Sequence, residues 1–372
     1  MKKALIVATL GGFIGFEKNN IKLLKQKGFE VYIACNTSGF EKYLKQFKVN
    51  IIDIPFSRQP FSKNNYFAYK KLKNIINTTK FELIHCHTPT GSVIARLAAK
   101  KARKKMGTKV IYTAHGFHFF KGAPIKNWLI YYPIERTCSR FTDIIITINN
   151  EDYKFAKEKM KSKEVYYISG VGLDIKSIND CKITRQEKRI ELGLKDEDFI
   201  ILSVGELNKN KNHKLIINAL STLNIKNLHF VIAGTGRLKQ YYELLIKQLN
   251  LEENVHLLGY RTDIIEIYKI ADVFCFPSFR EGLSVSLMEA MANGLPCIVS
   301  NIRGNVDLIE DDIGGYLIDP MDVKSFNNTL IKLLYDNEKS INMGLYNSEK
   351  IKQFDLSIVE PIISKIYDNC FD

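Results

Sequence analysis

The chain has 372 residues, of which 45% are hydrophobic and 25% are charged. This length exceeds one ordinary core and predicts two domains, and the apolar content excludes general disorder. No apolar run reaches the roughly 18 residues needed to cross a bilayer. The seven scattered cysteines, mostly in apolar stretches, favour reduced thiols in a cytosol over a disulfide framework.

The charge is distributed unevenly along the chain. Residues 1–173 hold 31 of the 54 basic and 11 of the 40 acidic residues, a net charge of +20, and the remainder has −6. A basic first half joined to a mildly acidic second half indicates an anionic partner for one domain only. Nucleic acid, an anionic membrane surface and a pyrophosphate-bearing substrate are the candidates.

Apolar stretches alternate with helical patterns throughout the first half. Strands are predicted at residues 3–9, 30–34, 49–54, 81–87, 109–113, 143–148 and 165–168, and helices at residues 17–27, 92–105 and 150–161. Ligands of such parallel sheets bind at the carboxyl ends of the strands. Gly11 and Gly12, in the turn after the first strand, are therefore a candidate ligand loop, with a plain strand-to-helix turn as the alternative.

Three histidines stand near the carboxyl ends of predicted strands. His85 and His87 share one face of the strand at residues 81–87, but no third ligand is apparent nearby. A structural or substrate-facing role is therefore favoured over a metal site. His115 follows the strand at residues 109–113, beside Gly116, and this position favours a functional role.

Two segments of the first half mix aromatic and basic residues. Residues 58–77 predict either a basic amphipathic helix that lies on anionic lipid or an ordinary helix with a solvated lysine face. Residues 117–132 contain Trp128, the single tryptophan of the chain. Two interpretations of this segment stay open: its aromatic side chains pack in the core, or they form a lipid groove or a membrane-facing lip.

A hinge at Gly170, Gly172 and Asp174 is predicted to separate two doubly wound domains, at residues 1–173 and 174–350, that face each other across a cleft. The second has predicted strands at residues 199–204, 228–233, 255–258, 271–276, 296–300 and 314–318. Gly205, followed by polar and basic residues before a helix, is typical of a phosphate-facing turn. A helix at residues 351–372 is expected to pack back on the first domain.

Residues 274–309 form the most informative stretch of the second half. A strand ends at Phe276 and breaks at Pro277, a loop with Glu281 and Gly282 follows, and a helical pattern then runs to Asn293. Glu281 and Glu289 stand at the two ends of this connection. A carboxylate beside a helix N-terminus, with a glycine that lets a ligand approach the backbone, indicates a site for a phosphorylated sugar.

Glu281, seven further residues and Glu289 resemble the E-x7-E motif of retaining glycosyltransferases of family 4 with the GT-B fold. The resemblance extends over the whole chain, through VGELNKNKNH, IAGTG and HLLGYRTDI. The N-terminal half is similar to bacterial capsule and exopolysaccharide transferases. This resemblance implies transfer of a sugar from a nucleotide diphosphate sugar, of the UDP-linked kind, to a polyprenyl-diphosphate-linked glycan, with no metal and no other cofactor.

The same resemblance implies roles for individual residues. Glu281 lies against the donor sugar, Glu289 holds the ribose hydroxyls, Lys211 neutralises the leaving diphosphate, and His115 lies near the sugar and acceptor. The other implied donor-binding residues are Gly11, Gly12, Gly205, Lys209, Gly234, Tyr260, Gly282, Leu283 and Ser284.

Two positions depart from the family pattern. Glu206 stands where an arginine often follows the glycine of the donor turn, with Lys209 as the candidate replacement for that charge, and Asp307 stands where a glutamate is common.

Three other interpretations stay open from the sequence. One is a nucleotide-sugar epimerase of related fold, and another is a carbohydrate-binding protein without catalysis. The third, a nucleic-acid binder, has no RNP aromatic pattern, zinc spacing or helix-turn-helix to support it. The basic first domain predicts a cytoplasmic protein that is peripheral on the inner face of the plasma membrane.

Overall fold

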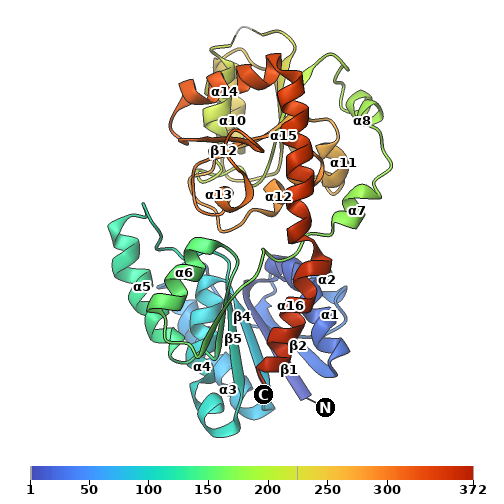
Figure 1. The fold of residues 1–372 in the computed structure, drawn as a ribbon. Helices are drawn as coiled ribbons and strands as arrows, with labels where there is room; N and C mark the ends of the chain where they lie inside the picture. Colours follow the sequence, from blue (N-terminus) through green and yellow to red (C-terminus); the bar gives the residue numbers. More distant parts are fainter. Residues whose placement is uncertain (1, 224, 372) are drawn as a thin grey trace. The chain divides into compact units, whose positions relative to one another are not determined.

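The computed structural model describes residues 2–223 and 225–371, in two compact units. One unit comprises Met1–Val171 with Ser357–Asp372, and the other comprises Gly172–Leu356. Each contains one parallel sheet with helices on its faces (Figure 1). The predicted fold class, two Rossmann-like α/β domains, is confirmed.

The sheet of the first unit has the strand order β3-β2-β1-β4-β5-β6-β7. Its strands are β1 (Lys2–Leu10), β2 (Phe29–Asn36), β3 (Asn50–Asp53), β4 (Leu83–His87), β5 (Lys109–Ala114), β6 (Ile144–Thr147) and β7 (Glu164–Tyr167). The central strands are buried on both faces, which explains their continuous apolar runs. Strand order reverses between β1 and β4, so the segments that follow these two strands diverge from a common point, where α/β sheets bind ligands.

The helices of this unit are η1 (Gly11–Glu17, a 3₁₀ helix), α1 (Lys18–Gln26), α2 (Glu41–Lys45), α3 (Lys63–Thr79), α4 (Pro89–Met106), α5 (Ile125–Ser139), α6 (Asn150–Lys159) and α16 (Leu356–Asn369). The helix predicted at residues 17–27 is present as α1, and Glu17 is the last residue of the 3₁₀ turn that precedes it. The aromatic segment is partly core, since Phe119 is buried and packs against Trp128, Tyr132 and Phe155.

Helix α16 brings the end of the chain onto the first unit, where it lies beside the N-terminal strands (Figure 1). Its buried face carries Val359, Ile363, Ile366 and Tyr367. The Tyr367 hydroxyl lies 2.8 Å from His85 Nδ1 in β4, so this helix is tied to the centre of the sheet.

The sheet of the second unit has the order β10-β9-β8-β11-β12-β13. Its strands are β8 (Phe199–Val204), β9 (Leu228–Ala233), β10 (Val255–Gly259), β11 (Val273–Phe276), β12 (Cys297–Ser300) and β13 (Gly315–Ile318). The order reverses between β8 and β11, so the loops after these strands meet at one edge. Its helices are α7 (Ile175–Asn179), α8 (Arg185–Glu191), α9 (His213–Leu220), α10 (Lys239–Gln248), α11 (Ile264–Tyr268), α12 (Val285–Ala292), α13 (Asn305–Leu308), α14 (Val323–Tyr335), α15 (Asn337–Lys350) and the 3₁₀ helix η2 (Ile351–Phe354).

All seven cysteines are free. Six of them are buried, and Cys181, between α7 and α8, is half-buried. Burial raises the pKa of the Cys35, Cys86 and Cys370 thiols to about 12, which keeps them in the unreactive protonated form.

A buried guanidinium organises the start of the second unit. Arg189 of α8 is fully buried and donates to the carbonyl oxygens of Lys195, Asp196, Asp198 and Ile270 and to the Asp272 carboxylate, at 2.8–3.1 Å. Residues 196–198, Asp-Glu-Asp, form an acidic turn before β8, and these contacts give the turn a structural role. Its Asp198 carboxylate accepts from the Lys195 amide at 2.7 Å.

Replacing Arg189 with methionine should destabilise the protein by about 3 to 5 kcal/mol, because several buried oxygens lose their donor. Urea unfolding of Arg189→Met measures this loss. Arg185→Met is the matched control, since Arg185 also contacts Asp272 but its side chain is 43% exposed. A loss below about 1 kcal/mol is expected for the control. Equal losses in the two variants would contradict the role given to the buried guanidinium.

Candidate active site

Four loops at the carboxyl edge of the second sheet pack backbone against backbone in two pairs. Gly234, after β9, has φ of 155°, and a Cβ there would lie 1.9 Å from the Gly205 carbonyl oxygen. Gly304, after β12, has φ of 82°, and a Cβ there would lie 2.1 Å from the Gly282 carbonyl oxygen. Only glycine permits these conformations and contacts together, so the loops after β8 and β11 are held in fixed positions.

An ion pair joins the loops after β8 and β11. Lys211 Nζ lies 2.9 Å from Glu281 Oε1, and the two side chains are 17% and 13% exposed. The ammonium also lies 4.2 Å from the centroid of the Phe276 ring, a cation–π contact. An ammonium has three N–H donors, so Lys211 can hold Glu281 and an anionic ligand oxygen at the same time.

Two residues that sequence reasoning missed hold the Glu281 loop. Asn210 donates to the Arg280 carbonyl at 2.9 Å and lies 3.4 Å from Glu281 Oε1. Buried Arg303 donates to the Glu281 carbonyl at 3.3 Å. The sequence carried a signal for each, because Asn210 adjoins Lys211 and Arg303 precedes Gly304 just after the strand at residues 296–300.

Helix α12 begins directly after the Glu281 loop. Ser284 caps it, its hydroxyl accepting from the Leu287 amide at 3.5 Å. Gly282 and Leu283 precede this cap. The partial positive charge of a helix N-terminus attracts anions, so this turn can stabilise negative charge beside Lys211.

Glu289 lies further along α12 and is half-buried. Its Oε2 is 2.9 Å from the Tyr268 hydroxyl, which is also 2.8 Å from the Ser286 carbonyl oxygen. Burial raises the pKa of Glu289 to about 7. A hydroxyl has one proton to donate, so when Tyr268 donates to Ser286, a protonated Glu289 donates to Tyr268.

The remaining predicted residues of this unit lie in separate surroundings. Lys209 lines a hollow of about 540 Å³ with Lys214, Tyr241 and Met321. Tyr260, directly after β10, is 78% exposed. The structure thus brings Lys211 and Glu281 together in one contact, whereas Lys209 lines a hollow whose lining residues include neither of them.

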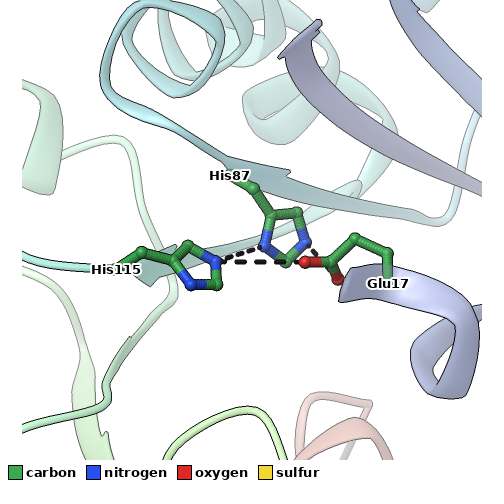
Figure 2. A group of neighbouring side chains, drawn as sticks. All are labelled: Glu17, His87 and His115. Atoms are coloured by element: carbon green, nitrogen blue, oxygen red, sulfur yellow. Dashed lines mark hydrogen bonds and ion pairs between the residues drawn. The ribbon is translucent and has the colours of Figure 1, made fainter. Parts of the chain in front are cut away.

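A second cluster lies in the first unit, at the point where strand order reverses (Figure 2). Glu17 Oε2 lies 3.1 Å from His87 Nε2, and His87 Nδ1 lies 3.2 Å from His115 Nε2. Glu17 and His87 are buried, whereas the His115 side chain is 20% exposed. Asn20 donates to Glu17 Oε2 at 2.6 Å.

Local packing fixes the cluster. The rings of Phe13 and His115 meet edge to face with centroids 4.9 Å apart. Thr88, directly after His87, has φ of 61°, which is strained for a β-branched residue. Its hydroxyl is hydrogen-bonded to the backbone amide and the hydroxyl of Thr9. A Cβ on Gly12 would lie 2.7 Å from the Phe40 ring, so this glycine permits close packing of η1.

The histidines of β4 have different partners. His85 is hydrogen-bonded to Thr113 and Tyr367 at 2.8 Å each and serves the core. Glu17 and His115 do lie beside His87, although neither is near it in the sequence. The three residues form the one described group whose possible metal-ligand atoms lie within 4.8 Å of one another. His87 presents different ring nitrogens to its two neighbours: Nδ1 is hydrogen-bonded to His115, whereas Nε2 contacts the Glu17 carboxyl group at 3.1 Å without a hydrogen bond.

Burial dominates the electrostatics of this cluster. It raises the pKa of Glu17 to about 8 and lowers the pKa of His115 to about 4 and that of His87 well below its usual value. Both rings are therefore neutral near pH 7. Sequence analysis missed Glu17 because it reads as the first residue of a helix. The available signal was a glutamate just after the glycine turn that follows the first strand.

Comparisons with known proteins agree with this architecture. Residues 184–350 match the family described as glycosyl transferases group 1, and residues 7–149 match the glycosyl transferase 4-like family. A putative glycosyltransferase EpsD of Bacillus subtilis (strain 168) is 37% identical over 376 residues, covering 100% of this chain and 97% of the relative. An Escherichia coli protein named UDP-Gal:alpha-D-GlcNAc-diphosphoundecaprenol alpha-1,3-galactosyltransferase is 30% identical over 350 residues, covering 90% and 88%.

Solved structures share the fold. Anabaena Alr3699/HepE in complex with UDP and glucose superposes with a TM-score of 0.82 at 20% identity, covering 99% of this chain and 100% of that one. The lipopolysaccharide glycosyltransferase WaaG gives a TM-score of 0.77 at 18% identity, covering 98% and 99%. The class is therefore that of GT-B enzymes. Within it, the chain belongs to the group 1 glycosyltransferases.

Stability should depend on pH through Glu289. Its pKa in the folded protein, about 7, exceeds the usual glutamate value of 4.5, so the stability that its protonated form contributes is lost as the pH rises through 7. Wild-type protein should lose stability relative to Glu289→Gln between about pH 5 and pH 8, as measured by urea midpoints. Tyr268→Phe, which keeps the carboxyl group, should retain this slope. A constant difference between wild type and Glu289→Gln would contradict the assignment.

Proposed function

We propose that this glycosyltransferase moves a sugar from a UDP-linked donor, with retention at the anomeric carbon, to a lipid-diphosphate-linked glycan during synthesis of a cell-surface polysaccharide. The observation that carries the proposal is the Lys211–Glu281 ion pair beside the N-terminus of α12. This arrangement suits a leaving diphosphate, which gains negative charge as the glycosidic bond breaks.

The names of relatives support the donor and acceptor classes. The Escherichia coli relative is named for transfer from UDP-Gal to a diphosphoundecaprenol-linked sugar. A Campylobacter jejuni relative, 26% identical over 360 residues, is named for an acceptor on diphospho-undecaprenol. A Staphylococcus aureus relative, 22% identical over 375 residues, is named for capsular polysaccharide biosynthesis.

Each donor-side residue has a distinct role in this proposal. Lys211 donates to a diphosphate oxygen, and the amides of Gly282, Leu283 and Ser284 add donors from the helix N-terminus. Glu281 orients the lysine and accepts from a hydroxyl of the donor sugar. Glu289 accepts from the ribose hydroxyls, which favours its ionised form.

The remaining predicted residues complete the set. Gly205, Gly234, Lys209 and Tyr260 are assigned to donor binding, as are Gly11 and Gly12. His115 is assigned to the sugar and the acceptor. We further propose that no metal ion is required, because the lysine and the amides supply the positive charge.

We also propose that the first unit contacts an anionic membrane at the cytoplasmic side. Phe61, Ile125 and Leu129 are 82%, 77% and 72% exposed. Lys126 adjoins Ile125, and the unit is strongly basic. Phe61 also lines a largely apolar hollow of about 120 Å³, with Val93, Tyr112, Phe117 and Tyr131, which suits part of a prenyl chain. No described helix is long and apolar enough to cross a bilayer, so surface contact is the form of association proposed.

A panel of nucleotide sugars with a prenyl-diphosphate glycan acceptor, read by mass spectrometry in EDTA, tests the reaction. Lys211→Ala and Glu281→Gln should each lower kcat/KM by roughly 10²- to 10³-fold, since each removes charge stabilisation or its orientation. Lys239→Ala, an exposed α10 lysine paired with Glu243, is the control. Unaltered rates in the two site variants would refute the site. Conversion of the donor without an acceptor would indicate an epimerase, and activity only with added divalent ions would refute metal independence.

Membrane contact is tested by flotation with vesicles that contain an anionic lipid. Ile125→Ser/Leu129→Ser protein should float several-fold less than wild type, because two apolar contacts are lost, and added salt should lower flotation further. Leu244→Ser is the matched control, since Leu244 is 63% exposed on α10 of the other unit. Equal flotation of both variants, with no response to salt, would contradict the proposed membrane contact.

A further inference from the structure

The Glu17–His87–His115 cluster connects a buried carboxyl group to a partly exposed ring. His87 is the middle member and uses both ring nitrogens, Nε2 toward Glu17 at 3.1 Å and Nδ1 toward His115 at 3.2 Å. His115 turns its Nε2 toward His87, and its Nδ1 lies on the far side of the ring (Figure 2). A neutral imidazole carries one N–H, so whether the His87 proton lies on the nitrogen that faces Glu17 determines the direction of the hydrogen bond between His87 and His115.

When Glu17 is ionised, its negative charge lies 3.1 Å from His87 Nε2 and 3.9 Å from His115 Nε2, and it favours a proton on each of these two nitrogens. His87 Nδ1 is then bare and accepts from His115 Nε2–H. The proton of His115 is thereby held inside the cluster, and the outer Nδ1 is left as a hydrogen-bond acceptor.

When Glu17 is protonated, the hydrogen bond between the two rings reverses. The carboxyl group then carries the proton that faces His87 Nε2, so the His87 proton lies on Nδ1 and donates to His115 Nε2, and His115 carries its proton on the outer Nδ1. The two states differ by one proton, on Glu17, and both rings are neutral in each. The outer nitrogen of His115 is thus an acceptor in one state and a donor in the other.

We propose that Glu17 and His87 are positioning residues that determine which ring nitrogen of His115 carries its proton, and so whether the outer nitrogen accepts or donates. This proposal rests on the proposed function for the role of His115. An acceptor hydroxyl that loses its proton must first donate a hydrogen bond. The state with ionised Glu17 is therefore the one that can receive it.

Because of the groups around it, Glu17 is the residue of this cluster whose protonation changes near pH 8. Asn20 of α1 donates to it, and His85, His87 and Thr113 of the strands, Tyr367 of α16 and His115 are the other polar groups nearby. Burial raises the pKa of Glu17 to about 8 and lowers the pKa values of His85 to about 3 and His115 to about 4. The carboxyl group is therefore protonated below about pH 8 and ionised above it.

The second unit offers a matched control. His229 Nδ1 lies 3.1 Å from His256 Nε2, and His229 Nε2 lies 3.6 Å from Asp198 Oδ1. The order of contacts, carboxyl to histidine to histidine, is the same. His229 and His256 lie at the starts of β9 and β10, and Asp198 lies directly before β8, at the opposite edge of the sheet from Lys211 and Glu281.

The test is long-range ¹H–¹⁵N NMR of the full chain labelled at histidine nitrogens. In wild type and in His229→Gln, the His115 tautomer should change from Nδ1–H to Nε2–H as the pH rises through about 8. Glu17→Gln and His87→Gln should abolish this change, while the fold is checked from the backbone amide spectrum. A His115 tautomer that is constant in wild type, or that changes equally in Glu17→Gln, overturns the proposal.

Two further measurements complete the test. The kcat/KM of wild type and His229→Gln should rise with an inflection near pH 8 that Glu17→Gln lacks. If Glu17→Gln keeps this inflection, the proposed effect of Glu17 on kcat/KM is overturned. If one equivalent of zinc shifts the NMR signals of His87 and His115, the cluster is a metal centre, and the proposed control of the His115 tautomer is overturned. Absence of any sugar transfer would refute the proposed function, whereas the tautomer measurement stands independently of it.

Discussion

The parallel direction of the strands is the constraint on which both sites depend. In each sheet the chain leaves two neighbouring strands toward opposite sides, β1 and β4 in one unit and β8 and β11 in the other. Residues distant in sequence therefore meet at the carboxyl edge. Lys211 and Glu281 are 70 residues apart, yet they form an ion pair because the loops that carry them leave adjacent strands.

The sequence was informative where a function needs a short local pattern. The two glutamates with seven residues between them, the lysine after a glycine turn and the histidine after a strand were all visible in the chain. Asn210 and Arg303 were missed because they act through backbone oxygens of a loop that is distant in sequence. Glu17 was missed because a single glutamate at the start of a helix has many common uses, and only the fold places it beside His87.

Element boundaries were less predictable than element types. The turn at residues 11–17 forms a 3₁₀ helix because its glycines allow it to pack against Phe40, a contact that no local propensity encodes. Helix α5 has a Pro133 in its interior and a low share of buried residues, so periodicity did not reveal it. The aromatic side chains around it divide between core and surface, a division that composition alone does not settle.

The distribution of cysteines has a practical consequence. Six thiols are buried in the two cores, whereas Cys181 is partly accessible in the segment that joins α7 to α8. The natural chain thus offers one favoured position for thiol-directed labelling, without removal of the other cysteines. A dye or spin label at this position, paired with a second one introduced in the first unit, would report the distance between the two units in solution with and without nucleotide sugar.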